Sequence, residues 1–248
     1  MTVFLLAIFI SVSMSASVAV VEEPDVATSL LQVSDRGRGG LQEGLEWTAN
    51  IETTENGDTS DREYLIKAKG HDAFVEALKP AKNKGEVYLF NDRQMWFFKP
   101  SIKKPLPISS RQKLTGQAAY GDIASTHYAR DYSATLEKTE DLNGAKHHVL
   151  LLKAKAKNLT YDQIRYWISD KTKLATKAEF LTLQGKPFKI GALEYNNVLS
   201  VGGKNIAFVS KLTITDAKFG QNKSVLNYSK PRIADHSDAI FNKNNMTR

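Results

Sequence analysis

Histidine has the widest scope for chemistry among the side chains of this sequence, but its five copies form no motif. His147 and His148 are adjacent, so on a strand their rings would point to opposite faces and could not share a metal ion. His71, His127 and His236 are isolated, and the HExxH, GxSxG and Walker patterns are absent. We therefore predict no catalytic residue, no bound metal and no cofactor. We also predict that the protein is not an enzyme. A hydrolase built from distant Ser, His and Asp residues is the alternative.

The chemistry that the sequence does favour is the burial of apolar surface. Residues 86–90 and 94–99 are predicted to form a hairpin. The run Met-Trp-Phe-Phe at 95–98 makes the second strand apolar on both faces, whereas a strand with one face in water alternates apolar and polar residues. Such a strand must be covered twice, by a core on one side and by a helix or a ligand on the other.

Composition narrows the classes of function further. The chain of 248 residues has a formal net charge of +7, but its charges are spread along the sequence and do not form the continuous basic stripe of a nucleic-acid-binding protein. Cysteine is absent, which excludes disulfides, thiolate metal sites, a cysteine nucleophile and a lipidated N-terminal cysteine. We therefore predict no nucleic-acid partner and no lipid anchor on the chain itself.

The N-terminus has the pattern of a secretory signal peptide. An apolar run at 3–14 precedes the small residues Ser17-Val18-Ala19, so we predict a signal peptide at 1–19 and a mature protein outside the cytoplasm, in the periplasm. No Lys or Arg occurs before Arg36, so the usual positive n-region is missing. An uncleaved membrane anchor is the alternative.

Beyond this segment the periodicity predicts one helix and then strands. Residues 25–33 have the apolar spacing of an amphipathic helix, which the glycine-rich residues 37–40 end. From Leu45 the period changes to two, and turn signals such as Asn56-Gly57 separate successive strands. Because the connections are short, neighbouring strands must be antiparallel, and we predict about ten or eleven of them.

Three stretches are predicted to be irregular. Residues 74–78 are predicted to form a short amphipathic link, and residues 99–121, with three prolines, a long irregular connection. The polar tail from Ser229 is predicted to be loose. With no internal repeat or linker, we predict a single domain at 20–248, with its core at about 25–228.

These elements resemble the outer-membrane lipoprotein-sorting (LolA-like) family. The order of elements is similar, and so is the strand Met95-Trp96-Phe97-Phe98-Lys99-Pro100. Further matches resemble the subgroup found beside large membrane exporters: Pro80, Gly85, Gly116-Gln117-Ala118, Tyr120-Gly121-Asp122, Tyr132, Tyr161-Asp162, Trp167 and Glu179-Phe180. The match covers nearly all of residues 25–228, and none of its motifs is catalytic.

The resemblance implies a mainly β fold, an unclosed antiparallel β-barrel shaped as a half-pipe, with an N-terminal helix and short lid helices over an apolar concave face. It implies a soluble, monomeric periplasmic carrier that binds acyl chains of lipoproteins or other lipids and shuttles them toward the outer membrane, from an inner-membrane exporter to an outer-membrane acceptor. Exposed methylenes cost about 0.8 kcal/mol each, so such cargo needs shielding from water. The alternative is a non-catalytic binding or sensor module that docks a membrane exporter or a signalling protein.

Two sets of residues are candidates for these functions. The loop lysines Lys99, Lys103 and Lys104 are candidates for docking a partner. The apolar candidates, which either line the groove or pack as core, are Trp47, Ile51, Val87, Leu89, Met95, Trp96, Phe97, Phe98 and Trp167.

Overall fold

A computed structural model describes residues 25–124 and 126–247. The predicted signal peptide, 1–19, lies outside the described residues. Within the described ranges, no helix has both the length and the apolar character needed to cross a membrane.

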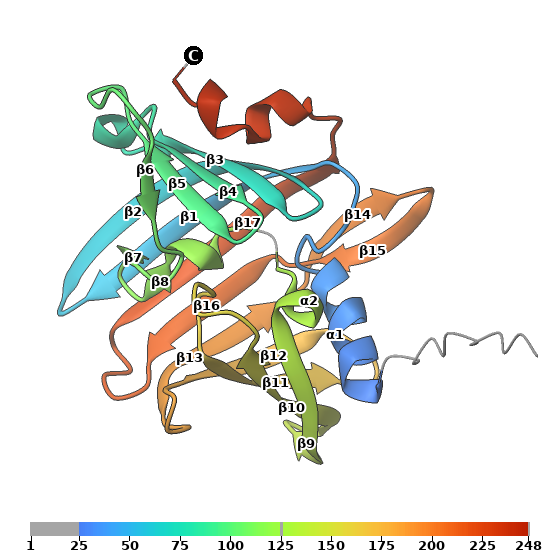
Figure 1. The fold of residues 1–248 in the computed structure, drawn as a ribbon. Coiled ribbons are helices and arrows are strands. Elements are labelled where there is room, and N and C mark those ends of the chain that lie inside the picture. The colour runs from blue at the N-terminus through green and yellow to red at the C-terminus, as the bar shows by residue number, and fades with distance from the viewer. Residues whose placement is uncertain (1–24, 125, 248) are drawn as a thin grey trace, which may run out of the picture.

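Thirteen strands form one antiparallel sheet in the order β6-β5-β4-β3-β2-β1-β17-β16-β13-β12-β11-β10-β9 (Figure 1). Strands β6 and β9 are its two edges and do not pair with each other, so the sheet is not closed into a barrel. The strands are β1 (Leu45–Glu55), β2 (Asp58–Lys69), β3 (Asp72–Lys79), β4 (Val87–Asn91), β5 (Gln94–Phe98), β6 (Leu106–Ile108), β9 (Tyr132–Leu142), β10 (Ala145–Ala154), β11 (Gln163–Ser169), β12 (Ala175–Leu181), β13 (Pro187–Glu194), β16 (Lys211–Asp216) and β17 (Lys223–Ile233).

Two small sheets and a few helical pieces complete the described chain. The hairpin β14 (Asn197–Val201) and β15 (Lys204–Phe208) stands beside the main sheet, and β7 (Lys113–Thr115) pairs with β8 (Ala118–Ala119). The helical pieces are α1 (Val26–Arg36), α2 (Tyr128–Asp131), η1 (Ala81–Asn83), η2 (Tyr120–Asp122), η3 (Asp238–Phe241) and η4 (Lys243–Asn245). The predicted fold class, a mainly β unclosed antiparallel sheet with few helices, is confirmed.

The structure contains more strands than the sequence predicts. The link predicted at 74–78 is part of strand β3, in which Ala73, Val75 and Ala77 are buried in strict alternation. The connection predicted to be irregular at 99–121 contains β6, β7 and β8. Two further strands, β14 and β15, pair with each other outside the main sheet.

Helix α1 confirms the predicted N-terminal helix. Its N-cap Asp25 accepts a hydrogen bond from Thr28 N at 2.7 Å, which satisfies one of the free amides of the first turn. Leu30, Leu31 and Ser34 are buried, so the helix packs one stripe against the inner face of the sheet. Its last turn brings Asp35 inside the molecule as well.

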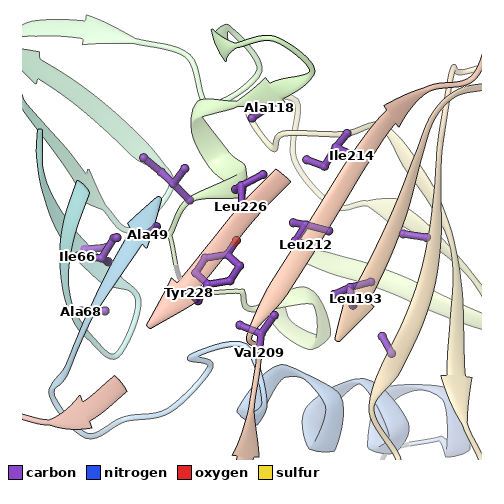
Figure 2. Close-up of a cluster of buried hydrophobic side chains, with 14 of the residues drawn as sticks. Ala49, Ile66, Ala68, Ala118, Leu193, Val209, Leu212, Ile214, Leu226 and Tyr228 are labelled. Carbon is purple, nitrogen blue, oxygen red and sulfur yellow. The ribbon is translucent and has the colours of Figure 1, made fainter. Parts of the chain in front are cut away.

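The main core fills the inner face of the curved sheet (Figure 2). This core includes Ala49 and Ile66 of β1 and β2 and Leu212 and Leu226 of β16 and β17, all of them at most 1% exposed. Tyr64, Tyr88, Tyr166 and Phe208 are among the largest fully buried side chains. The interior therefore mixes aliphatic residues with tyrosines whose hydroxyl groups need polar partners.

The C-terminal tail is not loose, which corrects the prediction from its polar composition. Strand β17 runs to Ile233, and η3 and η4 then lie across the outer side of β3, β4 and β5 (Figure 1). Phe241 and Met246 are each 5% exposed and pack with Leu89 in a second apolar cluster. Phe241 and Met246, with Ile240 packed beside them, anchor a segment that is mostly polar.

Candidate functional site

A cavity of about 90 Å³ lies on the inner face of the sheet, between the β3–β5 region and the segment that carries α2. Phe90, Met95 and Leu159 contribute apolar walls. Charged residues, among them Asp92 and Arg130, border the same cavity. An apolar pocket with a polar mouth can hold a hydrocarbon chain whose polar end stays outside.

Four charged residues at this mouth, Asp92, Arg93, Arg130 and Asp131, form what we call the mouth clasp. Arg93 Nε donates to Asp131 Oδ1 at 3.1 Å, and Arg130 Nη1 donates to Asp92 Oδ1 at 2.7 Å. Arg130 and Asp131 end α2, directly before the edge strand β9, whereas Asp92 and Arg93 form the β4–β5 turn near the other edge. The clasp therefore joins the two sides of the open sheet.

A second set of contacts joins the two sides beside the clasp. Arg111 Nη2 donates to Asp162 Oδ1 at 2.7 Å. Asn158 Nδ2 donates to the carbonyl of Arg93 at 2.6 Å, and Ser110 Oγ donates to the carbonyl of Asn158 at 3.1 Å. Side-chain contacts of this kind, and not a backbone ladder between β6 and β9, hold the mouth closed.

Helix α2 rests on the end of α1 through buried polar groups. Asp35 Oδ2 accepts a hydrogen bond from Ala129 N at 2.9 Å, and Arg38 lies 5.5 Å from the ring centroid of Tyr128 and donates to Tyr166 Oη at 3.3 Å. Burial raises the pKa of Asp35 to about 7, outweighing the opposite effects of the Ala129 amide and of Arg38. Asp35 Oδ1 has no hydrogen-bond partner among the described residues, which also favours the neutral carboxyl.

Two histidines join the start of α2 to the turn between β2 and β3. The ring centroids of His71 and His127 are 4.6 Å apart in an edge-to-face arrangement. Burial, with the nearby His71 and Arg130, lowers the pKa of His127 to about 4. His127 is therefore neutral near pH 7, and the contact is one of ring packing and not of charge.

A second buried carboxyl fixes the segment behind the cavity. Tyr161 Oη donates to Asp122 Oδ2 at 2.9 Å, and the Ala119 amide donates to the same oxygen at 2.8 Å. Burial raises the pKa of Asp122, while Lys189 and these donors act in the opposite direction. The Asp122 carboxyl therefore finds its hydrogen-bond donors within the tyrosine-rich interior.

The structure places four of the nine apolar candidates on the inner face. Trp47, Ile51 and Met95 are buried in the main core, and Phe97 packs against it. Trp47 makes an edge contact with Phe208 at 5.7 Å between centroids. Of these four, Met95 borders the cavity.

Four other candidates lie on the outer face, in the second apolar cluster. The strand that is apolar on both faces is covered twice, as predicted: the main core covers one face, and the C-terminal tail, with Phe241 and Met246, covers the other. In the conformation described, alternation on β4 and β5 directs these four candidates away from the cavity, so here they take the alternative role of packed core. They are Val87, Leu89, Trp96 and Phe98.

Trp167 also lies away from the cavity. It alternates with Tyr166 and Ile168, which belong to the main core. Its Nε1 donates to Glu140 Oε1 at 2.6 Å, and Lys177 Nζ lies 4.1 Å from its ring centroid. Its buried ring is held by polar neighbours instead of facing a groove.

The adjacent histidines bind separate partners. His147 Nε2 lies 2.9 Å from Thr176 Oγ1, and His148 Nε2 lies 2.8 Å from Asp170 Oδ1. Among residues 25–124 and 126–247, no group of three His, Cys, Asp or Glu side chains is placed to hold a metal ion.

The predicted docking loop connects β5 to β6. Lys103 and Lys104 are exposed, and Lys99 is partly exposed. With Trp96 and Lys243 of the tail, Lys103 and Lys104 border a shallow depression on the outer face. The loop is therefore free to contact a partner without disturbing the cavity.

Sequence reasoning missed the residues that border the cavity mouth. The clasp arginines stand 37 positions apart and pair with carboxylates of the opposite segment. The only signal in the sequence is the complementary order of Asp92-Arg93 and Arg130-Asp131, which gives no information on distance in space.

Comparisons with known proteins give a family and a fold. A family model described as an uncharacterized protein matches residues 69–248. A LolA superfamily protein from Nitrosomonas europaea has 29% identity and a TM-score of 0.79, with 89% of this chain and 99% of that chain covered. An outer membrane lipoprotein-sorting protein domain from Vibrio parahaemolyticus has 20% identity and a TM-score of 0.74, covering 90% and 98%. A DUF1329 family protein from Desulfovibrio piger has 19% identity and a TM-score of 0.72, covering 88% and 98%. No curated protein is significantly similar to the chain.

Proposed function

The chain belongs to the family whose model matches residues 69–248, and it has the LolA-like fold. We propose that it is a periplasmic carrier that binds the acyl chains of lipoproteins or other lipids. The cargo enters between the two sides of the open sheet and is released toward the outer membrane. The similarity to a LolA superfamily protein and to a lipoprotein-sorting domain supports this proposal. Catalysis is not part of it.

The observation that carries the proposal is an apolar inner face closed at its mouth by side-chain contacts. Partly exposed ion pairs contribute about 0–1 kcal/mol each, so opening the clasp and its neighbouring contacts costs a few kcal/mol. Burying ten methylenes yields about 8 kcal/mol. The gain from cargo exceeds the cost of opening, and an empty carrier closes again.

The cavity in its closed form is too small for a whole acyl chain. Pockets for small molecules commonly measure about 300–1,000 Å³, against about 90 Å³ here. Cargo therefore requires the clasp to separate and α2 to move away from β4 and β5. Helix α2 has no fully buried residue, and Tyr128 and Ala129 are only partly buried against the main core, so α2 is the element best suited to move.

The same small cavity favours a second candidate, a binding or sensor module that docks a membrane exporter or a signalling protein and carries no lipid. In that case the inner face stays filled by side chains. Only the carrier proposal requires an inner-membrane exporter as the donor of the cargo and an outer-membrane protein as its acceptor.

We also propose that residues 20–248 act as one monomeric domain after removal of residues 1–19. The pairing of β1 with β17 supports this, because it joins the two ends of the described chain in the centre of one sheet.

A charge placed inside the cavity tests the carrier proposal. Leu159 is 7% exposed and borders the cavity from a loop, so Leu159→Glu is less disruptive to the sheet than a change on β5. Leu183→Glu, at a turn residue that is 69% exposed, is the matched control. Protein purified without detergent is assayed by native mass spectrometry for bound lipid and by uptake of a fluorescent fatty acid.

We expect Leu159→Glu to lose bound lipid and probe uptake while Leu183→Glu retains both. Circular dichroism and thermal unfolding establish that both variants are folded. Unchanged uptake by a folded Leu159→Glu protein would contradict the carrier proposal and favour the sensor module.

A further inference from the structure

Six lysines from three chain segments gather at one corner of the molecule, beside the edge strand β6. The segments are 80–85, 99–105 and 242–247, and none of them contains Asp or Glu. Figure 1 shows the connection between β5 and β6 and the C-terminal helical pieces on the same side of the sheet. We call this surface the basic corner; its lysines are Lys82, Lys84, Lys99, Lys103, Lys104 and Lys243.

Contacts between the segments bring these lysines onto one surface. A Cβ atom at Gly85 would lie 3.1 Å from Pro100 Cγ, so the turn with Lys82 and Lys84 touches the β5–β6 connection. Lys243 Nζ lies 4.3 Å from the ring centroid of Trp96, and it borders the same depression as Lys103 and Lys104. Trp96 thus lies among the lysines.

The basic corner lacks neutralising partners. Some lysines elsewhere in the described chain pair with carboxylates, as Lys79 does with Glu63 at 2.6 Å. None of the six corner lysines makes an ion pair within residues 25–124 and 126–247. Glu86, the carboxylate next to the first segment, accepts a hydrogen bond from Tyr88 Oη at 3.0 Å. The charge of the corner is therefore available to an outside partner.

We propose that the basic corner docks the protein on an anionic membrane surface, with the lysines at lipid phosphates and Trp96 at the boundary between headgroups and acyl chains. Juxtaposed lysines bind an anionic bilayer additively and need no fixed geometry, because the phosphates are many and move laterally. Tryptophan is enriched at that boundary, where its ring is half in water. A specific protein or nucleic-acid partner would instead favour the fixed fork of arginine, which these segments lack.

The basic corner lies apart from the cavity and shares no lining residue with it. The proposal therefore goes beyond lipid binding: it concerns where the protein meets a membrane, and it holds for the carrier and for the sensor module. Because the tail supplies Lys243 and also covers Trp96, the cluster of η3 and η4 becomes part of the docking surface.

The test compares two variants of equal charge. Lys82→Glu, Lys103→Glu and Lys104→Glu are combined in the corner variant. Lys171→Glu, Lys186→Glu and Lys204→Glu, at exposed positions outside the corner, form the control, so each variant loses six charge units from +7. Both variants and the unaltered protein begin at the same residue, so any membrane affinity of the N-terminal segment cancels. Partition is measured by co-sedimentation with phosphatidylcholine vesicles, with and without phosphatidylglycerol.

We expect the unaltered protein and the control to bind the anionic vesicles more tightly than the neutral ones. The corner variant should lose about 100-fold in partition coefficient, from the loss of three lysine–bilayer attractions. Added salt should reduce the binding of the unaltered protein, since the Debye length shortens. Equal partition of both variants, whether high or low, would overturn the proposal.

Tryptophan fluorescence gives a second readout. Trp47 and Trp167 are 2% and 4% exposed, so Trp96 is the indole that can change its surroundings at a membrane. We expect a blue shift on addition of anionic vesicles, which Trp96→Phe abolishes. A shift that persists in Trp96→Phe would contradict the placement of the ring. Probe uptake by the corner variant should be unchanged, which separates this proposal from the carrier function.

Discussion

The mouth clasp and the basic corner use charge in opposite ways. In the clasp, Arg93 and Arg130 meet Asp92 and Asp131 within 3.1 Å, so the charges of two distant segments neutralise each other. In the basic corner, like charges from three segments lie together without carboxylates. Paired charges hold parts of one molecule in place, whereas unpaired charges of one sign leave attraction for another molecule. The mouth clasp is therefore suited to closing the sheet, and the basic corner is suited to docking on another surface.

The largest expected effect concerns the buried carboxyl under α2. The pKa of Asp35 is raised from 3.8 to about 7, so the folded state binds a proton more tightly than the unfolded state. Its contribution to stability is complete below pH 3.8 and is lost as the pH rises to about 7, by up to about 4 kcal/mol. Asp35→Asn, which mimics the neutral acid, should remove this loss. Urea unfolding of both proteins between pH 4 and pH 8 measures the difference.

Other groups titrate in the same range, so the test is the difference in free energy of unfolding between the unaltered protein and Asp35→Asn at each pH. The pH profile of one protein alone does not isolate Asp35. His127, with its pKa lowered to about 4, acts in the opposite direction: stability falls as the pH drops from 6.5 toward 4. If the stabilities of the unaltered protein and Asp35→Asn depend on pH in the same way, Asp35 does not contribute to the pH dependence of stability.

Shortening one side chain of the tail tests whether the outer and inner faces of the β4–β5 hairpin act independently. Phe241→Ala removes a ring that is 5% exposed in the outer cluster, and we expect about 3 kcal/mol of lost local stability, the low end for such changes. Hydrogen exchange of the η3 and η4 amides measures it. Uptake of lipid into the cavity should not change; a parallel loss of uptake would mean that the outer cluster supports the cavity.

Breaking the clasp should have a moderate effect on stability and a visible effect on uptake. Asp131→Asn weakens the ion pairs to Arg93 and Arg130, and we expect about 1–2 kcal/mol of lost stability because Asp131 is mostly buried. Fluorescent fatty acid should enter faster, by stopped-flow measurement. Asp141→Asn, an exposed position with the same change of charge, is the control. Slower or equal entry in Asp131→Asn would show that the clasp is not the gate.

The smallest expected effect on stability lies in the basic corner. Lys103→Ala should change the free energy of unfolding by less than about 0.5 kcal/mol, because the side chain is exposed and unpaired. Removal of one like charge from a cluster can even stabilise slightly. A loss above 1 kcal/mol in thermal unfolding would mean that Lys103 makes a structural contact. The charges of the basic corner would then not be unpaired, unlike the proposed difference from the clasp.

The sequence predicts the helix at the start, most strands and the double cover of β5, because period and turn chemistry are local properties. It does not predict β3 as a strand, since Phe74 and Leu78 also have helical spacing. Nor does it predict the tail: the polar residues around Phe241 and Met246 hide two anchors whose partners, such as Leu89, stand some 150 positions earlier.

The sequence by itself determined the LolA-like fold, the absence of cysteine and the need to cover a doubly apolar strand. The tertiary structure decided that the main core covers one face of β5 and the C-terminal tail covers the other. It also decided which residues border the cavity and which charged side chains form ion pairs. The physical reason is that alternation gives two faces to every strand but does not say which one the sheet curves around. Pairs such as Arg93–Asp131 and Arg130–Asp92 exist only once the two edges of that sheet have come together.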